Sequence, residues 1–112
     1  YCGSMHQTPY ATGFFDLGAC IGSLEYFQHN VVELALREAH RILKPGAKFV
    51  LDIPDVGSPE CTICALIEAY LGRADQFDLT RDAFERLLDP YFTLQAREKV
   101  GPMVQYFVRR KA

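Results

Sequence analysis

The sequence predicts an α/β fold in which two parallel strands are followed by an antiparallel hairpin, with helices on the faces of the sheet. In the first half, two short and continuously apolar runs flank a segment of helical periodicity, which is typical of a β-α-β unit in a parallel sheet. Near the C-terminus, apolar and polar residues alternate on both sides of Gly101-Pro102, which indicates a hairpin. A chain of 112 residues has room for one modest domain, so residues 1–112 are expected to form a single unit.

The β-α-β unit is expected over residues 14–53, after a loop at residues 1–13 that is rich in Gly, Ser, Thr and Pro. The run from Phe14 to Ile21 is nearly all apolar apart from Asp16. Continuous rather than alternating apolar character favours a strand that is buried on both faces.

The helix of this unit should begin at Asn30 as N-cap, with Glu33 completing a capping box. Its apolar residues recur at helical spacing: Val32, Ala35, Leu36, Ala39, Ile42 and Leu43. Lys44-Pro45-Gly46 is expected to end the helix, and residues 48–53 form the second buried strand. The crossover between the strands should be right-handed.

Two helices are predicted over residues 58–88. Ser58 can cap the first, with Pro59 at its first position, and Thr80 can cap the second, which runs to Leu88. The apolar stripe of the first helix contains Ile63, Leu66, Ile67, Tyr70 and Leu71, and the buried face of the second contains Phe84, Leu87 and Leu88. Residues 91–110 form the closing hairpin.

Composition narrows the possible partners. The net charge of −2 gives no electrostatic basis for binding nucleic acid, and no stretch is long and apolar enough to cross a membrane. The chain also lacks the basic start and apolar run of a signal peptide, so a cytoplasmic protein is expected.

Cys61 and Cys64 have C-x-x-C spacing without a second ligand pair for zinc, which leaves a redox protein as a weaker alternative.

Two stretches, together with the hairpin, are similar to the class I, Rossmann-like, S-adenosylmethionine-dependent methyltransferases of the type 11 kind. FFDLGACIGSLEYF, residues 14–27, resembles their fourth strand, and ALREAHRILKPGAKFVLDIPD, residues 35–55, resembles the following helix, turn and fifth strand. The family pattern E-x-x-R-x-L-K-P-G-G is matched in order by Glu38, Arg41, Leu43, Lys44, Pro45 and Gly46, with Ala47 in place of the second Gly.

This resemblance implies that the chain is a partial domain, the C-terminal half of a methyltransferase, without the glycine-rich cofactor loop and the ribose-binding acid. It also implies the strand order fourth, fifth, seventh, sixth, with the last strand antiparallel between its two neighbours. S-adenosylmethionine is the implied cofactor. Because its main polar partners are missing from the pattern, the isolated chain is expected to bind it weakly or not at all and to be inactive.

The resemblance also suggests which residues line the cofactor. The loop CGSMHQTPY is similar to the family loop G-D-x-x-x-L-P-F, with Ser4 in place of the acid and Met5 beside it. Cys20, Ile21 and Gly22 correspond to the strand end on the methionine side. His29, just before the expected helix, is the candidate for a base acting on the substrate. No catalytic residue is otherwise predicted, and no metal site.

Two alternatives remain open. Residues 16–22 also resemble the family's first motif, D-x-G-x-G-x-G, with Cys20 in place of the middle Gly. The spacing argues against that assignment, because the Lys-Pro-Gly turn follows after a single helix. The chain could also be a non-enzymatic half-domain that serves association or the binding of a small ligand.

Assembly is suggested by the first strand. As the fourth strand of an incomplete sheet it would lie at an edge, and from Phe14 to Ile21 it contains no Lys, no Pro and only Asp16 as a charge. We therefore expect a homodimer through this edge, with residues 1–13 packed nearby or exchanged between subunits. In the rival arrangement residues 1–13 fold back and cover the edge.

Overall fold

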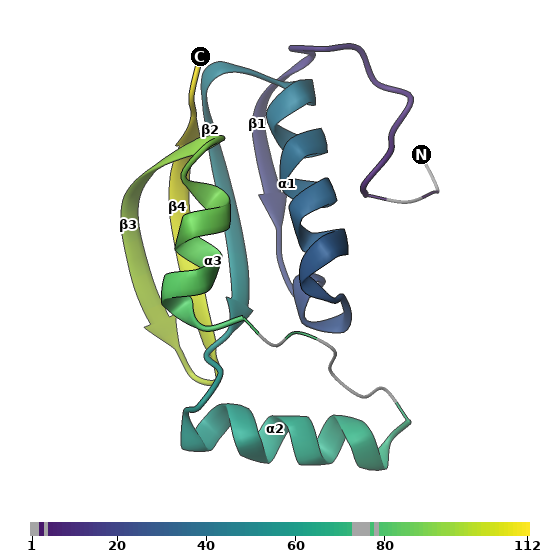
Figure 1. The fold of residues 1–112 in the computed structure, drawn as a ribbon, viewed down its shortest axis with the longest axis vertical. Helices are drawn as coiled ribbons and strands as arrows, with labels where there is room; N and C mark the ends of the chain where they lie inside the picture. The colour runs from purple at the N-terminus through teal and green to yellow at the C-terminus, as the bar shows by residue number, and fades with distance from the viewer. Residues whose placement is uncertain (1–2, 4, 73–76, 78) are drawn as a thin grey trace.

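The computed structural model describes residues 3, 5–72, 77 and 79–112 and shows a mixed sheet with two helices packed on one face (Figure 1). The elements in chain order are β1 (Phe15–Cys20), the 3-10 helix η1 (Leu24–Tyr26), α1 (His29–Ile42), β2 (Leu43–Pro54), α2 (Pro59–Tyr70), α3 (Arg81–Leu88), β3 (Phe92–Val100) and β4 (Met103–Arg110). The predicted α/β fold class is confirmed. No described helix is long and apolar enough to cross a membrane.

The sheet has the order β1-β2-β4-β3. β1 is parallel to β2, whereas β4 is antiparallel to both β2 and β3. The last strand of the chain therefore lies between its two neighbours, as predicted. β4 suits this central position because Val104, Tyr106 and Val108 are all buried against the helices.

The starts of α2 and α3 follow the predicted caps. Ser58 Oγ accepts the Cys61 N–H at 3.1 Å, and Thr80 Oγ1 accepts the Ala83 N–H at 3.2 Å. The start of α1 was predicted wrongly, because Asn30 is not its N-cap. The carbonyl of Gln28 already takes the first helical bonds, so α1 begins at His29 without a side-chain cap.

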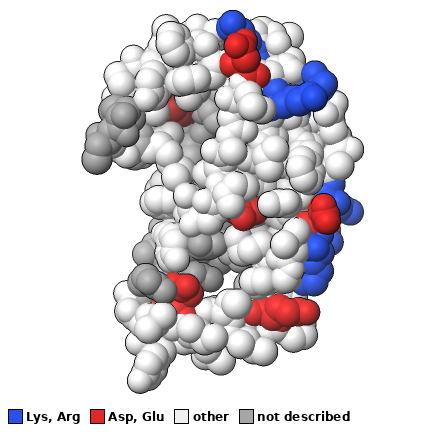
Figure 2. Space-filling model, turned by 180° about the vertical axis from the view of Figure 1, so that it is seen from behind, with Lys and Arg blue, Asp and Glu red and all other residues white. Residues whose placement is uncertain are grey.

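β1 also differs from expectation, because none of its residues is fully buried and only Phe15, Gly18 and Cys20 are half-buried. α1 and α3 lie on the same face of the sheet (Figure 1), and no described element covers the other face. On that open face Leu17 is 65% exposed. Seen from behind, the surface over the sheet is largely uncharged (Figure 2).

The apolar stripe predicted for α2 is turned toward solvent. α2 lies across the end of the sheet toward which β1 and β2 point (Figure 1), and none of its residues is buried. Its half-buried side consists of the smaller Cys61, Cys64 and Ala65 together with Glu68, which accepts a bond from the Tyr26 hydroxyl at 3.4 Å. Leu66 and Tyr70 are 67% and 91% exposed. The large apolar side chains of α2 therefore contribute little to the core.

Gly18 is a packing glycine within β1. A Cβ atom at this position would lie 3.0 Å from Phe49 Cδ1, and the Phe49 ring is itself stacked on Phe92 at 5.4 Å. We expect Gly18→Ala to lower the free energy of unfolding by about 1–3 kcal/mol, because the Phe49 ring has little room to shift. Urea denaturation followed by circular dichroism measures the change. Ala19→Ser, at the exposed next residue of the same strand, is the control, and equal stability of the two variants would contradict the packing role.

Candidate functional site

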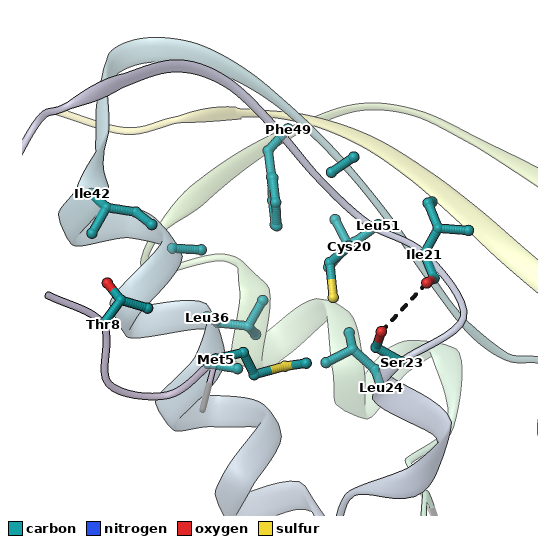
Figure 3. Close-up of a pocket in the computed structure, with 13 residues that line it drawn as sticks. Met5, Thr8, Cys20, Ile21, Ser23, Leu24, Leu36, Ile42, Phe49 and Leu51 are labelled. Carbon is teal, nitrogen blue, oxygen red and sulfur yellow. Dashed lines mark hydrogen bonds between the residues drawn. The ribbon is translucent and has the colours of Figure 1, made fainter. Parts of the chain in front are cut away.

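A mainly apolar cavity of about 360 Å³ lies at the carboxyl end of β1, between this strand, α1 and the N-terminal loop (Figure 3). It is lined by Met5, Thr8, Ala19, Cys20, Ile21, Ser23, Leu24, Ala35, Leu36, Ala39, Ile42, Phe49 and Leu51. Thr8 and Ser23 supply hydroxyl groups, and no lining residue in the described part of the chain carries a charge. The cavity therefore suits an apolar group rather than an ion.

The structure brings several of the predicted cofactor residues together here. Met5, Cys20 and Ile21 line the cavity, and the Cys20 sulfur points toward Met5 and Leu24 (Figure 3). Ser4 lies outside the described residues. Gly22 does not line the cavity but follows directly after Ile21. That these residues hold a cofactor stays a prediction.

Gly22 is fixed by a residue that was not predicted for the site. Its N–H donates to Asp52 Oδ1 at 2.9 Å, and Asp52 is only 6% exposed near the end of β2. The φ of Gly22 is +69°, in the left-handed region that favours glycine. The bond therefore joins the turn after β1 to the neighbouring strand. The sequence signal for Asp52 was only an acid close to the carboxyl end of a predicted strand.

The loop over the cavity is held by Glu38 and Arg41, the two polar residues of the E-x-x-R pattern. Glu38 Oε2 accepts both the N–H and the hydroxyl of Thr8, at 2.7 and 2.6 Å. Arg41 donates to both carboxylate oxygens of Glu38, at 2.7 and 2.8 Å. The Arg41 carbonyl also accepts the Gly13 N–H at 2.8 Å. We call Glu38 and Arg41 the loop clamp.

The loop clamp perturbs the ionisation of its acid. The hydrogen bonds from Arg41, and to a smaller extent those from Thr8, lower the pKa of Glu38 from 4.5 to about 2. The carboxylate is thus charged over the whole physiological range. The pattern was recognised through the family resemblance, but no role was predicted for these two side chains. In the structure they hold Thr8, and with it the loop, against α1.

The other candidates lie apart from the cavity. His29 is exposed as the first residue of α1 and does not line the cavity. Cys61 and Cys64 sit on α2, and neither they nor Cys20 form a disulfide in the described part of the chain. Among the described residues no group of three or more His, Cys, Asp or Glu side chains could hold a metal ion.

Comparisons with known proteins agree with this architecture. Residues 1–51 match the family model described as "Methyltransferase domain". No curated protein sequence matches the chain. Among solved structures, the PH0226 protein from Pyrococcus horikoshii OT3 superposes with a TM-score of 0.79 at 22% identity, over 97% of this chain and 57% of that one.

Two further solved structures have titles that name an activity. One is a Thermotoga maritima S-adenosylmethionine-dependent methyltransferase, described as a possible histamine N-methyltransferase. It superposes with a TM-score of 0.75 at 19% identity, over 97% of this chain and 62% of the Thermotoga protein. The other is geranyl diphosphate C-methyltransferase from Streptomyces coelicolor A3(2), solved with Mg²⁺, geranyl diphosphate and S-adenosyl-L-homocysteine. It superposes with a TM-score of 0.73 at 15% identity, over 98% of this chain and 53% of the Streptomyces protein.

The fold and the matched motif together define a Rossmann-like domain of the class I methyltransferase type. Residues 1–51 are thus similar in sequence to a methyltransferase domain and the chain shares the fold of these solved structures, so the resemblance noted from its sequence is confirmed. It spans 57% of the length of the Pyrococcus protein and 62% of the Thermotoga protein.

The residues around the cavity fit only part of S-adenosylmethionine. The apolar walls and the sulfur-bearing Met5 and Cys20 suit the aliphatic groups around its sulfonium centre. The described lining residues offer no carboxylate for the ribose hydroxyls or the ammonium group, and no cation for the carboxylate. These residues alone therefore support no step of methyl transfer through the cofactor.

Proposed function

We propose that this chain forms one wall of an S-adenosylmethionine-dependent methyltransferase site. The observation that carries the proposal is the convergence of Met5, Cys20 and Ile21 on a cavity at the carboxyl end of β1. Open α/β sheets bind their ligands beyond the carboxyl ends of the strands. The solved relatives with this fold include proteins titled as S-adenosylmethionine-dependent methyltransferases, which supports the same cofactor here.

In this proposal the described side chains that line the cavity shape the pocket and exclude water from it, and they supply no acid-base chemistry. Methyl transfer depends mainly on alignment of donor and acceptor in a pocket without water. Leu24, Leu36 and Phe49 supply apolar walls, and the loop clamp keeps Met5 and Thr8 in place. The bond from Gly22 to Asp52 fixes the turn that would face the reacting groups. We also propose that His29 is the base that acts on the substrate. Its exposed side chain at the start of α1 is accessible to a substrate.

The proposal includes a cytoplasmic location. It is supported by Cys64, a half-buried thiol that forms no disulfide among the described residues, as is usual in a reducing compartment.

Calorimetric titration of the chain with S-adenosylmethionine tests the proposal. We expect no saturable heat at micromolar concentration, because the described residues of the lining include no charged partner for the polar ends of the cofactor. S-adenosylhomocysteine, which lacks the methyl group and the sulfonium charge, is the parallel ligand. Micromolar affinity for either would contradict the single-wall proposal. It would also support the alternative assignment of Gly18 and Gly22 to a complete cofactor loop, which the close approach of Gly18 to the Phe49 ring disfavours.

A second candidate function is association without catalysis. It is favoured by the exposed apolar side chains of α2, among them Leu66 at 67% and Tyr70 at 91% exposure.

A further inference from the structure

We propose that Asp52 is the binding point for a primary amino group on the methyl acceptor. Asp52 is the one charged residue that is buried in the described part of the chain, with only 6% of its surface exposed. The identification of the amine as the methyl acceptor rests on the proposed function, whereas the amine site itself rests on the surroundings of Asp52.

The carboxylate of Asp52 is only partly satisfied. Its Oδ1 accepts the Gly22 N–H at 2.9 Å, and within the described residues its Oδ2 has no hydrogen-bond partner and no cation is paired with it. Buried charges in proteins are normally hydrogen-bonded and paired with an opposite charge, because their removal from water is costly. A single neutral N–H does not compensate the charge, so Oδ2 is suited to a further donor that is positively charged.

Asp52 lies where an α/β sheet binds its ligands. It is close to the carboxyl end of β2, and its bond to Gly22 reaches the turn that follows β1. The carboxyl ends of neighbouring parallel strands form the binding edge of such sheets. β2 lies between β1 and β4, so Asp52 is held inside the sheet and its position does not depend on what lies beside the outer side of β1.

The turn at Gly22 leaves room for a ligand. A Cβ atom added to Gly22 would meet no atom within 4 Å, so there is open space beside the residue that is bonded to Asp52. Ile21, which is 50% exposed, offers an apolar contact at the same turn. Ile21, Ser23 and Leu51, the chain neighbours of the bonded pair, also line the cavity (Figure 3). A polar point next to an apolar surface suits an amine with an apolar substituent.

A metal ion or a hydroxyl group suits this position less well. Among the described residues no group of three or more His, Cys, Asp or Glu side chains could hold a metal ion, so Asp52 would be an isolated ligand. A hydroxyl group would give Oδ2 a hydrogen bond but would leave the negative charge buried without compensation. An ammonium group supplies both the N–H donors and the positive charge.

NMR titration of the labelled chain with benzylamine tests the proposal, and benzyl alcohol is the uncharged ligand of nearly the same shape. At neutral pH benzylamine carries an ammonium group. We expect amide shifts centred on Gly22 and Asp52 that saturate in the millimolar range, as is usual for small ligands. The affinity for benzyl alcohol should be at least about tenfold lower, because the charge-assisted hydrogen bond is lost. Equal affinity for the two ligands would overturn the proposal, and this comparison needs only the wild-type chain.

Asp52→Asn keeps the shape of the side chain and an oxygen for the Gly22 N–H but removes the charge. We expect it to bind benzylamine at least about tenfold more weakly than the wild type, with an unchanged circular dichroism spectrum. Asp82→Asn is the matched control, because Asp82 is an exposed acid on α3, and this variant should bind like the wild type. Undiminished binding by Asp52→Asn, or an equal loss in Asp82→Asn, speaks against the site.

Titration with S-adenosylhomocysteine distinguishes the source of the amine, because this ligand also carries an amino group. We expect its weak binding to be equally strong in the wild type and in Asp52→Asn. A loss of affinity in Asp52→Asn would assign the amino group to the cofactor and overturn the acceptor assignment. The two proposals fail separately. Binding of benzylamine without binding of S-adenosylhomocysteine contradicts the cofactor wall and leaves the amine site intact, whereas the reverse result contradicts the amine site alone.

Discussion

Phe84→Ala is expected to lower the free energy of unfolding by about 3–5 kcal/mol. Phe84 on α3 is completely buried, with its ring 5.3 Å from that of Tyr106 and 6.1 Å from that of Phe77. Truncation to Ala leaves a cavity that these neighbours cannot fill. Because small domains are stable by only about 5–15 kcal/mol, this single change removes a large share of the total.

Urea denaturation monitored by circular dichroism measures this loss. Tyr70→Ala is the control, because Tyr70 is an aromatic residue that is 91% exposed on α2, and we expect it to change stability by less than about 0.5 kcal/mol. If the two variants were equally stable, α3 would not be packed on the sheet in the way described here.

Glu38→Gln is expected to remove most of the decrease in the free energy of unfolding that acid causes through the N-terminal loop. The carboxyl of Glu38 has a lowered pKa in the folded state, near 2 instead of 4.5. The unfolded state therefore binds the proton more readily, and stability falls as the pH decreases from about 4.5 to about 2. The shift corresponds to about 3 kcal/mol at most, and solvent screening at the partly exposed Arg41 reduces this to about 1–2 kcal/mol.

Thermal unfolding of wild type and Glu38→Gln at a series of pH values from neutral to about 2.5 tests this expectation, since the range spans the titration of the group. Glu33→Gln on the same helix is the matched control, because no partner is found for Glu33 among the described residues. Parallel pH profiles for wild type and Glu38→Gln would contradict the loop clamp. Faster exchange of the Thr8 amide in Glu38→Gln is the local sign that the loop has been released.

The order and type of the elements could be predicted from local patterns. The change from helical to alternating periodicity located α3, β3 and β4, and the caps at Ser58 and Thr80 are formed by the side chains expected for them. These features depend on residues that are close together in the sequence.

The sequence was a poorer guide to burial. An apolar stripe indicates which side of an element is suited to packing, but it does not show whether a partner exists. Leu17 in β1 and Leu66 in α2 are therefore exposed, although their patterns are typical of buried positions.

The polar contacts of the site were also missed, because their partners are distant in the sequence. The bonds from Thr8 to Glu38 and from Gly22 to Asp52 each join residues 30 positions apart. No local pattern reports such a pairing. Met5, Cys20 and Ile21 were found only because the family resemblance suggested them, and the structure brings them to one cavity.

NMR tests most directly whether this cavity is one wall of a cofactor site. The amide spectrum of the labelled chain is followed during titration with S-adenosylhomocysteine into the millimolar range, where weak complexes become populated. We predict shifts in fast exchange that are concentrated at Met5 and from Cys20 to Gly22. No shifts at these residues at the highest concentration, or shifts concentrated on α2 or the β3–β4 hairpin, would contradict the claim.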